Sequence, residues 1–292
     1  MASDAFPWMY TKRTIKQMWR CQPQIPNQQG LSERFLGDQA PLVPEKTKFG
    51  LYKIPCGIEV EVEGITREWP GRFTLWSVTN DGSLRNNGVE LISVPILGRN
   101  IDYALAELKW ALDSQPEKSF SHRCSTHVHI NVADLDYTQI IYLTALYGCF
   151  EKLFFYLVNE EREHNPYCYP ITTLDISREQ FANFVVPESK YCAFNPLHFR
   201  DYGSLEFRHM QGAEDLEVLE RWIQVIQKLV SYIKDANLEE LHHRILALNT
   251  NSAYGALLSD VFDPIHRMLW GELDLQEYME DGVTWSKMFL TA

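Results

Sequence analysis

The sequence predicts an α+β fold built on a largely antiparallel sheet, and three kinds of pattern predict it. Several short segments alternate apolar and polar residues, which is typical of half-buried strands. Turn signals separate some of these segments, and segments with the apolar spacing of an amphipathic helix separate others. Strands joined by both hairpins and helices indicate an α+β fold rather than a parallel α/β one.

The clearest strand covers residues 56–63, and its two faces differ sharply in polarity. One face carries Ile58, Val60 and Val62, and the other carries Glu59, Glu61 and Glu63. Further strands are expected over residues 73–78, 89–94, 126–132, 191–195 and 204–208. The run of Asn80, Asp81 and Gly82 predicts a turn between the second and third strands.

Helical spacing of apolar residues predicts helices over residues 101–113, 138–163 and 216–233. After residue 238 we expect a helical stretch that becomes irregular toward the end. Residues 1–49, which are rich in Gln, Pro and Gly over much of their length, predict an irregular N-terminal arm. The expected organisation is therefore this arm, a catalytic domain over residues 50–237, and a helical extension over residues 238–292 packed on the same domain.

Composition and charge exclude several classes of protein. The 292 residues are 45% hydrophobic with 15 Gly and 14 Pro, which is typical of a globular protein rather than a disordered or fibrous one. The net charge of −12 argues against direct nucleic-acid binding and against binding to a membrane surface, because both need a basic face. The apolar stretch at residues 140–158 contains Glu151 and Lys152, so it predicts a buried helix rather than a membrane span.

The cysteines and the N-terminal residues bear on the compartment. The six cysteines are too far apart for a CxxC metal or redox pair, and they indicate reduced thiols in a cytoplasmic protein. Residues 1–20 lack the apolar stretch of a signal peptide, which agrees with a cytoplasmic location.

Side chains that bind metal ions or phosphate recur on the polar faces of the predicted strands. The three carboxylates along residues 56–63 would lie ~6.6–7 Å apart, and they repel one another unless water or a cation separates them. His127 and His129 share a strand face, as do Glu206 and Arg208. Taken singly, these features are also typical of a solvent-facing edge, of structural histidines and of a surface ion pair.

Taken together, these residue types favour Mg²⁺ or Mn²⁺ over a structural zinc site, because most of the donors are carboxylate oxygens. Asp81 and Glu90, on either side of a short loop, add two further carboxylates. An arginine beside several carboxylates fits a nucleoside triphosphate held by metal ions. The sequence contains no P-loop and no kinase motif set, so carboxylate-held ions would have to neutralise the phosphates.

Five short motifs, in this order along the chain, resemble those of the amidoligase family. Members of that family are carboxylate–amine ligases related to glutamate–cysteine ligase and glutamine synthetase. The motifs are Gly57-Ile-Glu-Val-Glu61, Asp81-Gly-Ser-Leu84 with Gly88-Val-Glu-Leu-Ile-Ser93, Thr126-His-Val-His129, Arg162-x-x-Asn165-x-Tyr167, and Ser204-Leu-Glu-Phe-Arg208. Lys190 and Tyr191, followed by Asn195, resemble the strand before the last motif, and the resemblance covers about residues 50–235.

The resemblance implies a glutamine synthetase-like fold, in which a curved antiparallel sheet forms a funnel and helices pack on its convex face. It implies ATP and Mg²⁺ (or Mn²⁺) as cofactors, and the implied metal ligands are Glu59, Glu61, Glu90, His127 and Glu206. The implied catalytic residues are Arg208, Glu206 and Arg162, and the implied cofactor contacts are Arg208, Lys190 and Asn195. The roles of Glu63 and His129 stay open.

The implied reaction is ATP-dependent amide formation through an acyl phosphate, between a carboxylate and an amine of small molecules or peptides. Two other classes of function fit the same residues. A metal-dependent hydrolase would use His127, His129 and carboxylates to activate water. A non-catalytic binding protein would keep the fold without the chemistry. Turnover that requires ATP separates the ligase from both alternatives.

Overall fold

The computed structural model describes residues 54–98, 100–182, 191–196, 198–199, 203–213 and 215–291. Its strands form one six-stranded open sheet with the order β2-β3-β1-β4-β6-β5, in which every neighbouring pair is antiparallel. The strands are β1 (Cys56–Val62), β2 (Trp76–Asn80), β3 (Val89–Ser93), β4 (Ser125–Asn131), β5 (Phe194–Asn195) and β6 (Ser204–Gln211). The predicted α+β class with an antiparallel sheet is confirmed, whereas the funnel and the likeness to glutamine synthetase stay predictions.

Eight α-helices and two short 3-10 helices accompany the sheet in the described part of the chain. The α-helices are α3 (Asn100–Asp113), α4 (Tyr137–Val158), α5 (Arg178–Ala182), α7 (Leu216–Asp235), α8 (Leu238–Ala247), α9 (Asn251–Phe262), α10 (His266–Trp270) and α11 (Gln276–Thr291). The 3-10 helices are η2 (Glu160–His164) and η3 (Ile171–Thr173). The predicted arm over residues 1–49 and the predicted cofactor contact Lys190 lie outside the described residues.

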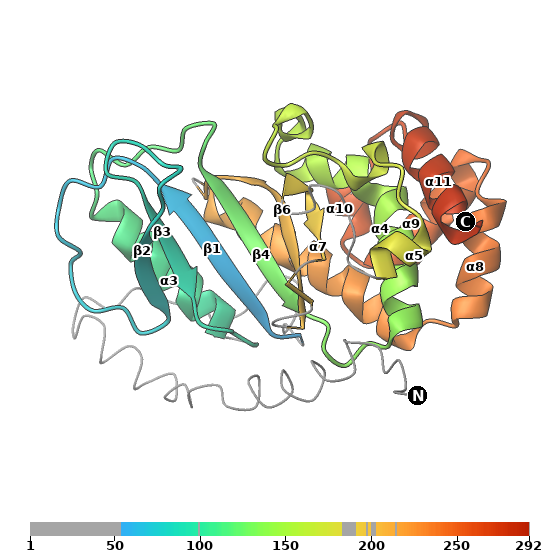
Figure 1. Ribbon diagram of the computed structural model, residues 1–292, viewed down its shortest axis with the longest axis horizontal. Helices are drawn as coiled ribbons and strands as arrows, with labels where there is room; N and C mark the ends of the chain where they lie inside the picture. The colour runs from blue at the N-terminus through green and yellow to red at the C-terminus, as the bar shows by residue number, and fades with distance from the viewer. Residues whose placement is uncertain are drawn as a thin grey trace, which may run out of the picture.

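The apolar face of the sheet packs against α3 and α7, which lie on the same side of it (Figure 1). The core-facing Ile58 and Val60 are fully buried, as strict alternation along β1 requires. Trp76 donates its indole N–H to the Ala104 carbonyl oxygen of α3 at 2.9 Å. On the α7 side, the ring of Phe207 meets Trp222 edge-to-face with centroids 6.1 Å apart. One face of every long strand therefore packs in the core, and the other face carries polar side chains.

The C-terminal helices form a separate layer beyond β5 and β6, where α11 lies along α4 (Figure 1). Two glycines allow this close packing. A Cβ on Gly148 of α4 would lie 2.7 Å from Ser286 Oγ, and one on Gly282 of α11 would lie 2.3 Å from the Gly148 carbonyl oxygen. The expected irregular end is therefore wrong, because α11 is ordered to Thr291 by buried side chains such as Trp285 and Phe289.

Three predicted boundaries differ from the structure for local reasons. The strand expected over residues 73–78 begins at Trp76, because the Glu107 carboxylate accepts the backbone N–H groups of Thr74 and Leu75 at 2.6 and 2.9 Å. The helix expected over residues 138–163 ends at Val158, and the polar residues after Asn159 form η2 instead. The strand expected over residues 191–195 shortens to the two residues of β5.

Helix α4 is long and apolar enough to cross a membrane by length and composition alone, but 78% of its most apolar window is buried inside the protein. It packs against α7 and α11. This burial agrees with the predicted core helix.

Candidate functional site

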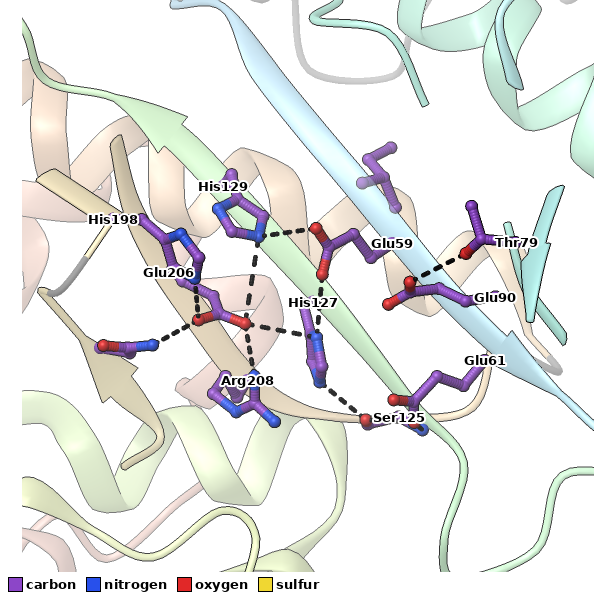
Figure 2. A network of polar contacts seen from close by, with 12 residues as sticks. Glu59, Glu61, Thr79, Glu90, Ser125, His127, His129, His198, Glu206 and Arg208 are labelled. Atoms are coloured by element: carbon purple, nitrogen blue, oxygen red, sulfur yellow. Dashed lines mark hydrogen bonds and ion pairs between the residues drawn. The ribbon is translucent and has the colours of Figure 1, made fainter. Parts of the chain in front are cut away.

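Cross-strand pairing brings the polar face of the sheet together into one cluster. Glu61 of β1 is directly opposite Glu90 of β3, and Glu59 is directly opposite His127 of β4. His129 is in turn opposite Glu206 of β6. Side chains directly opposite one another in an antiparallel pair have Cβ atoms ~4.5–5.5 Å apart. Four strands therefore contribute to one contiguous polar surface (Figure 2).

Glu59 lies between the two histidines of β4. Its Oε2 is 3.2 Å from His127 Nδ1, and its Oε1 is 3.2 Å from His129 Nε2. Burial alone would raise the pKa of Glu59, but the two imidazoles outweigh it and hold the pKa well below the ordinary range. Burial likewise would lower the pKa of His129, whereas the Glu59 and Glu206 carboxylates raise it. Glu59 is therefore an anion in the folded protein at neutral pH.

Glu206 is the most enclosed carboxylate of the cluster, with a side chain only 1% exposed. Its Oε1 accepts from Arg208 Nη1 at 2.5 Å and lies 3.3 Å from His127 Nδ1. Its Oε2 accepts from Asn195 Nδ2 at 2.5 Å and lies 3.2 Å from His198 Nε2. Burial would raise the pKa of Glu206, but His198, His127 and Arg208 hold it well below the ordinary range. A buried anion with this many cationic or polar neighbours is held in one orientation.

Ser125 joins His127 to Glu61. Its hydroxyl lies 2.7 Å from His127 Nε2 and donates to Glu61 Oε2 at 2.6 Å, and its backbone N–H donates to the same oxygen at 2.7 Å. His127 thus has Ser125 at one ring nitrogen and two carboxylates at the other (Figure 2). This arrangement fixes both the rotamer of His127 and the direction of the Glu61 carboxylate.

Glu90 and Asp81 close the other end of the cluster. Glu61, Asp81 and Glu90 each offer an oxygen, and these atoms lie within 4.8 Å of one another. Burial and the nearby charges of Glu59, Glu61 and Asp81 raise the pKa of Glu90 to about 7. Glu90 accepts only a long hydrogen bond, from Thr79 Oγ1 at 3.3 Å. Like charges are thus concentrated here with little compensation from the described residues.

A β-bulge in β6 places Arg208 beside the cluster. Thr126 pairs with Met210 and Val128 pairs with Phe207, so Arg208 and His209 together lie opposite the single residue His127. Bulges of this kind redirect side chains and are common beside active sites.

Arg162 holds the bulge in place, and it is not a member of the polar cluster. Its Nη2 donates to the Arg208 carbonyl oxygen at 3.0 Å, and its Nε donates to that of His209 at 3.1 Å. Cys168 Sγ contacts the Arg208 carbonyl oxygen at 3.1 Å as well. Arg162 therefore acts on the geometry of Arg208 through the backbone of β6.

Comparisons with known proteins give one match. A family model described as "Putative amidoligase enzyme" matches residues 71–206. This match supports an assignment to the amidoligase family. The match includes Glu90, His127 and Glu206, whereas Glu59 and Glu61 precede it. A search of curated proteins found no match.

The structure places the sequence-predicted site residues in different ways. The structure brings the following together in one polar cluster: Glu59, Glu61, Glu90, His127, Glu206 and Arg208. Asn195 joins the cluster by its hydrogen bond to Glu206, while Arg162 lies behind it on the backbone of β6. Glu63 stands apart, because its carboxylate accepts the Arg85 backbone N–H at 2.9 Å.

Sequence reasoning missed His198 and Ser125, and it counted the carboxylate of Asp81 without placing it among the metal ligands. Ser125 could have been found, because it shares the strand face of His127 and His129 by simple alternation. His198 follows a two-residue strand outside any periodic pattern, so only its three-residue separation from Asn195 hinted at it.

The residues present fit divalent cations. The cluster contains five carboxylates and one arginine, Arg208, which pairs with Glu206. Within the cluster, three groups of donors, two of which share Glu90, have ligand atoms within 4.8 Å of one another. The groups are Glu61 with Asp81 and Glu90, Glu59 with Glu90 and His127, and Glu206 with His129 and His198. The first group is all oxygen, which suits Mg²⁺ or Mn²⁺, and histidines enter toward the other end of the row.

Proposed function

We propose that this amidoligase-family protein is an ATP-dependent carboxylate–amine ligase that forms an amide bond through an acyl phosphate. The observation that carries the proposal is the convergence of five carboxylates, three histidines and Arg208 on one face of the sheet. The like charges of Glu61, Asp81 and Glu90 suit divalent cations with a polyphosphate, rather than a polyphosphate alone. The family match supports the ligase chemistry.

The proposed division of labour follows the geometry of the cluster. Glu59, Glu61, Glu90, His127 and Glu206 would hold Mg²⁺ or Mn²⁺, which supplies charge neutralisation for the phosphates of ATP when bound. Arg208 is oriented by Glu206 and by the bulge. Its proposed role is to stabilise the charge that develops on a transferring phosphoryl group.

The reaction then proceeds in two steps. A substrate carboxylate oxygen attacks the γ-phosphorus of ATP, the bond to the bridging oxygen breaks, and ADP leaves. A neutral amine attacks the acyl carbon, phosphate leaves, and a carboxylate or imidazole of the cluster accepts the proton of the amine. Small-molecule and peptide substrates both fit this chemistry, and a cytoplasmic location with no membrane or nucleic-acid partner belongs to the same proposal.

A metal-dependent hydrolase is the second candidate. The observation that favours it is the group of His129, His198 and Glu206, because two imidazoles and one carboxylate are also the ligands of catalytic zinc in hydrolases. This alternative expects turnover of an amide or ester without ATP.

The test compares two charge-altering variants with a matched surface pair. Glu206→Gln keeps the shape of the side chain but removes its charge, and Arg208→Lys keeps the charge but loses the planar fork. Each should lower ADP release, measured with a panel of acids and amines, by about 10²–10³-fold. The control pair is Glu217→Gln and Arg221→Lys on α7, whose ion pair at 3.2 Å is exposed.

A second measurement does not depend on knowing the substrates. ATP with Mg²⁺ should raise the melting temperature of the wild type more than either alone, because binding to the folded state stabilises it by mass action. Absence of any shift at millimolar ATP and Mg²⁺, or full ATP-dependent activity of both site variants, would remove the basis of the ligase proposal.

A further inference from the structure

His129, His198 and Glu206 form a group whose chemistry differs from that of the rest of the cluster. His129 is directly opposite Glu206 in the register of β4 and β6. The His198 ring meets the His129 ring edge-to-face, with centroids 4.8 Å apart and an interplanar angle of 78°. One nitrogen from each ring and one oxygen of Glu206 lie within 4.8 Å of one another (Figure 2).

His129 Nε2 is a buried nitrogen that points into this group without a hydrogen-bond partner among the described residues. It lies at ion-pair distance from two carboxylate oxygens, 3.2 Å from Glu59 Oε1 and 3.9 Å from Glu206 Oε1. Buried polar atoms are usually satisfied by protein, by water or by an ion. This nitrogen is therefore placed to receive a ligand.

The two oxygens of Glu206 are used differently. Oε1 accepts a hydrogen bond from the Arg208 guanidinium at 2.5 Å, so the negative charge on this oxygen is already compensated. Oε2 faces His198 Nε2 at 3.2 Å and is oriented by the Asn195 amide at 2.5 Å. Carboxylates that bind metal ions are usually oriented by a hydrogen bond of this kind.

We propose that His129, His198 and Glu206 bind one transition-metal ion of the Zn²⁺ class, at a position separate from the all-oxygen group of Glu61, Asp81 and Glu90. Imidazole nitrogen favours transition metals, whereas Mg²⁺ favours oxygen donors and gives up its water reluctantly. The inference goes beyond the proposed ligase reaction, since it assigns an ion that needs no nucleotide to bind, although it shares Glu206 with the proposed ATP site.

The experiment measures Co²⁺ and Zn²⁺ binding to the full chain without ATP. The protein is first stripped with a chelator, and Co²⁺ is then added in the presence of excess Mg²⁺. The wild type should bind one Co²⁺ with the visible absorption of a nitrogen-ligated ion, and Zn²⁺ should displace it. Mg²⁺ in excess should leave this ion in place while it fills the all-oxygen group.

The variants separate this position from its neighbours. His129→Ala and His198→Ala should each weaken Zn²⁺ binding by at least about tenfold, since removing a direct ligand costs no less than removing a residue that hydrogen-bonds to a ligand. Glu61→Gln should leave Zn²⁺ affinity near the wild-type value. The matched control is His243→Ala, an exposed imidazole on α8.

The His198 side chain is 35% exposed, so its truncation removes little buried surface, and far-UV circular dichroism checks the fold of each variant. Wild-type Zn²⁺ affinity in both His129→Ala and His198→Ala would overturn the proposal, as would displacement of the ion by Mg²⁺. Loss of Zn²⁺ binding in His127→Ala alone would place the ion in the central group and overturn it too. Failure of Mg²⁺–ATP to bind would refute the proposed function but leave these outcomes unaffected.

Discussion

Glu90 is the residue at which the cost of assembling the cluster can be measured. Burial and the carboxylates of Glu59, Glu61 and Asp81 raise its pKa from 4.5 to about 7. In the unfolded chain these neighbours are dispersed, and Glu90 titrates near its ordinary value. Folding at neutral pH therefore forces a charge onto Glu90 in an unfavourable place. Glu90→Gln removes that charge with almost no change of shape and should stabilise the metal-free protein.

The sign and size of the effect follow from proton linkage. Between about pH 4.5 and about pH 7 the folded state holds a proton on Glu90 that the unfolded state has released, so stability falls as pH rises through this window. The full shift corresponds to at most about 3 kcal/mol, at 1.36 kcal/mol per pH unit. Glu90 is only half-buried, and solvent screening reduces the expected loss to about 1–2 kcal/mol.

Urea unfolding in the presence of a chelator measures this loss. Wild type and Glu90→Gln should be about equally stable near pH 4, where Glu90 is largely protonated in both states, and the variant should be more stable by about 1–2 kcal/mol near pH 8. Glu107, whose pKa burial also raises to about 7, is present in both proteins and cancels in the difference. Glu68→Gln, at an exposed carboxylate, is the control.

Mg²⁺ should reverse the order of stability, because it binds the ionised cluster of the wild type and loses one ligand in the variant. The reasoning is refuted if the stability difference between wild type and Glu90→Gln does not change between about pH 4 and about pH 8. It is also refuted if the variant is less stable than the wild type without metal.

Two further predictions concern residues that orient the cluster. Ser125→Ala leaves His127 Nε2 and Glu61 Oε2 without their shared hydroxyl, so Mn²⁺ affinity, measured by titration, should fall about 10–100-fold, whereas the exposed Ser77→Ala should leave it unchanged. Arg162→Lys loses the two directed bonds to the backbone of β6, which should lower Mg²⁺–ATP affinity and reduce stability by about 1–3 kcal/mol in urea unfolding. Retention of wild-type affinity in either variant would contradict its orienting role.

Much of the fold could be predicted, because alternation along the strands states which face is buried. Ile58 and Val60 are fully buried, and Glu59 and Glu61 lie on the polar side, as their period of two requires. The error at the start of β2 arose because a distant side chain accepts hydrogen bonds from the backbone there. Glu107 accepts the N–H groups before β2, and no local pattern in residues 73–75 signals a carboxylate 32 residues away.

The candidate site was predictable to the extent that its members lie on regular strands. Alternation along a strand shows which side chains share a face, so the residues of metal-binding type on β1, β3, β4 and β6 could be identified. Which of them meet depends on register, and register is a property of the whole sheet. The location of Arg162 shows the limit: residue type and motif suggested a catalytic group, but the bulge that it holds exists only once β4 and β6 are paired.

The persistence of the cluster without metal follows from the opposite face of the same strands. Each charged residue of β1 alternates with a fully buried aliphatic one, and burying such a side chain contributes roughly 1.5–3 kcal/mol. The repulsion at Glu90 is expected to cost about 1–2 kcal/mol after screening, so one core side chain per carboxylate is enough to offset it. Because the two faces share one backbone, the carboxylates cannot move apart without withdrawing apolar side chains from α3 and α7. The sheet thus holds the ligand atoms close together before any cation binds. The free energy of cation binding is therefore not reduced by a cost of bringing these atoms together.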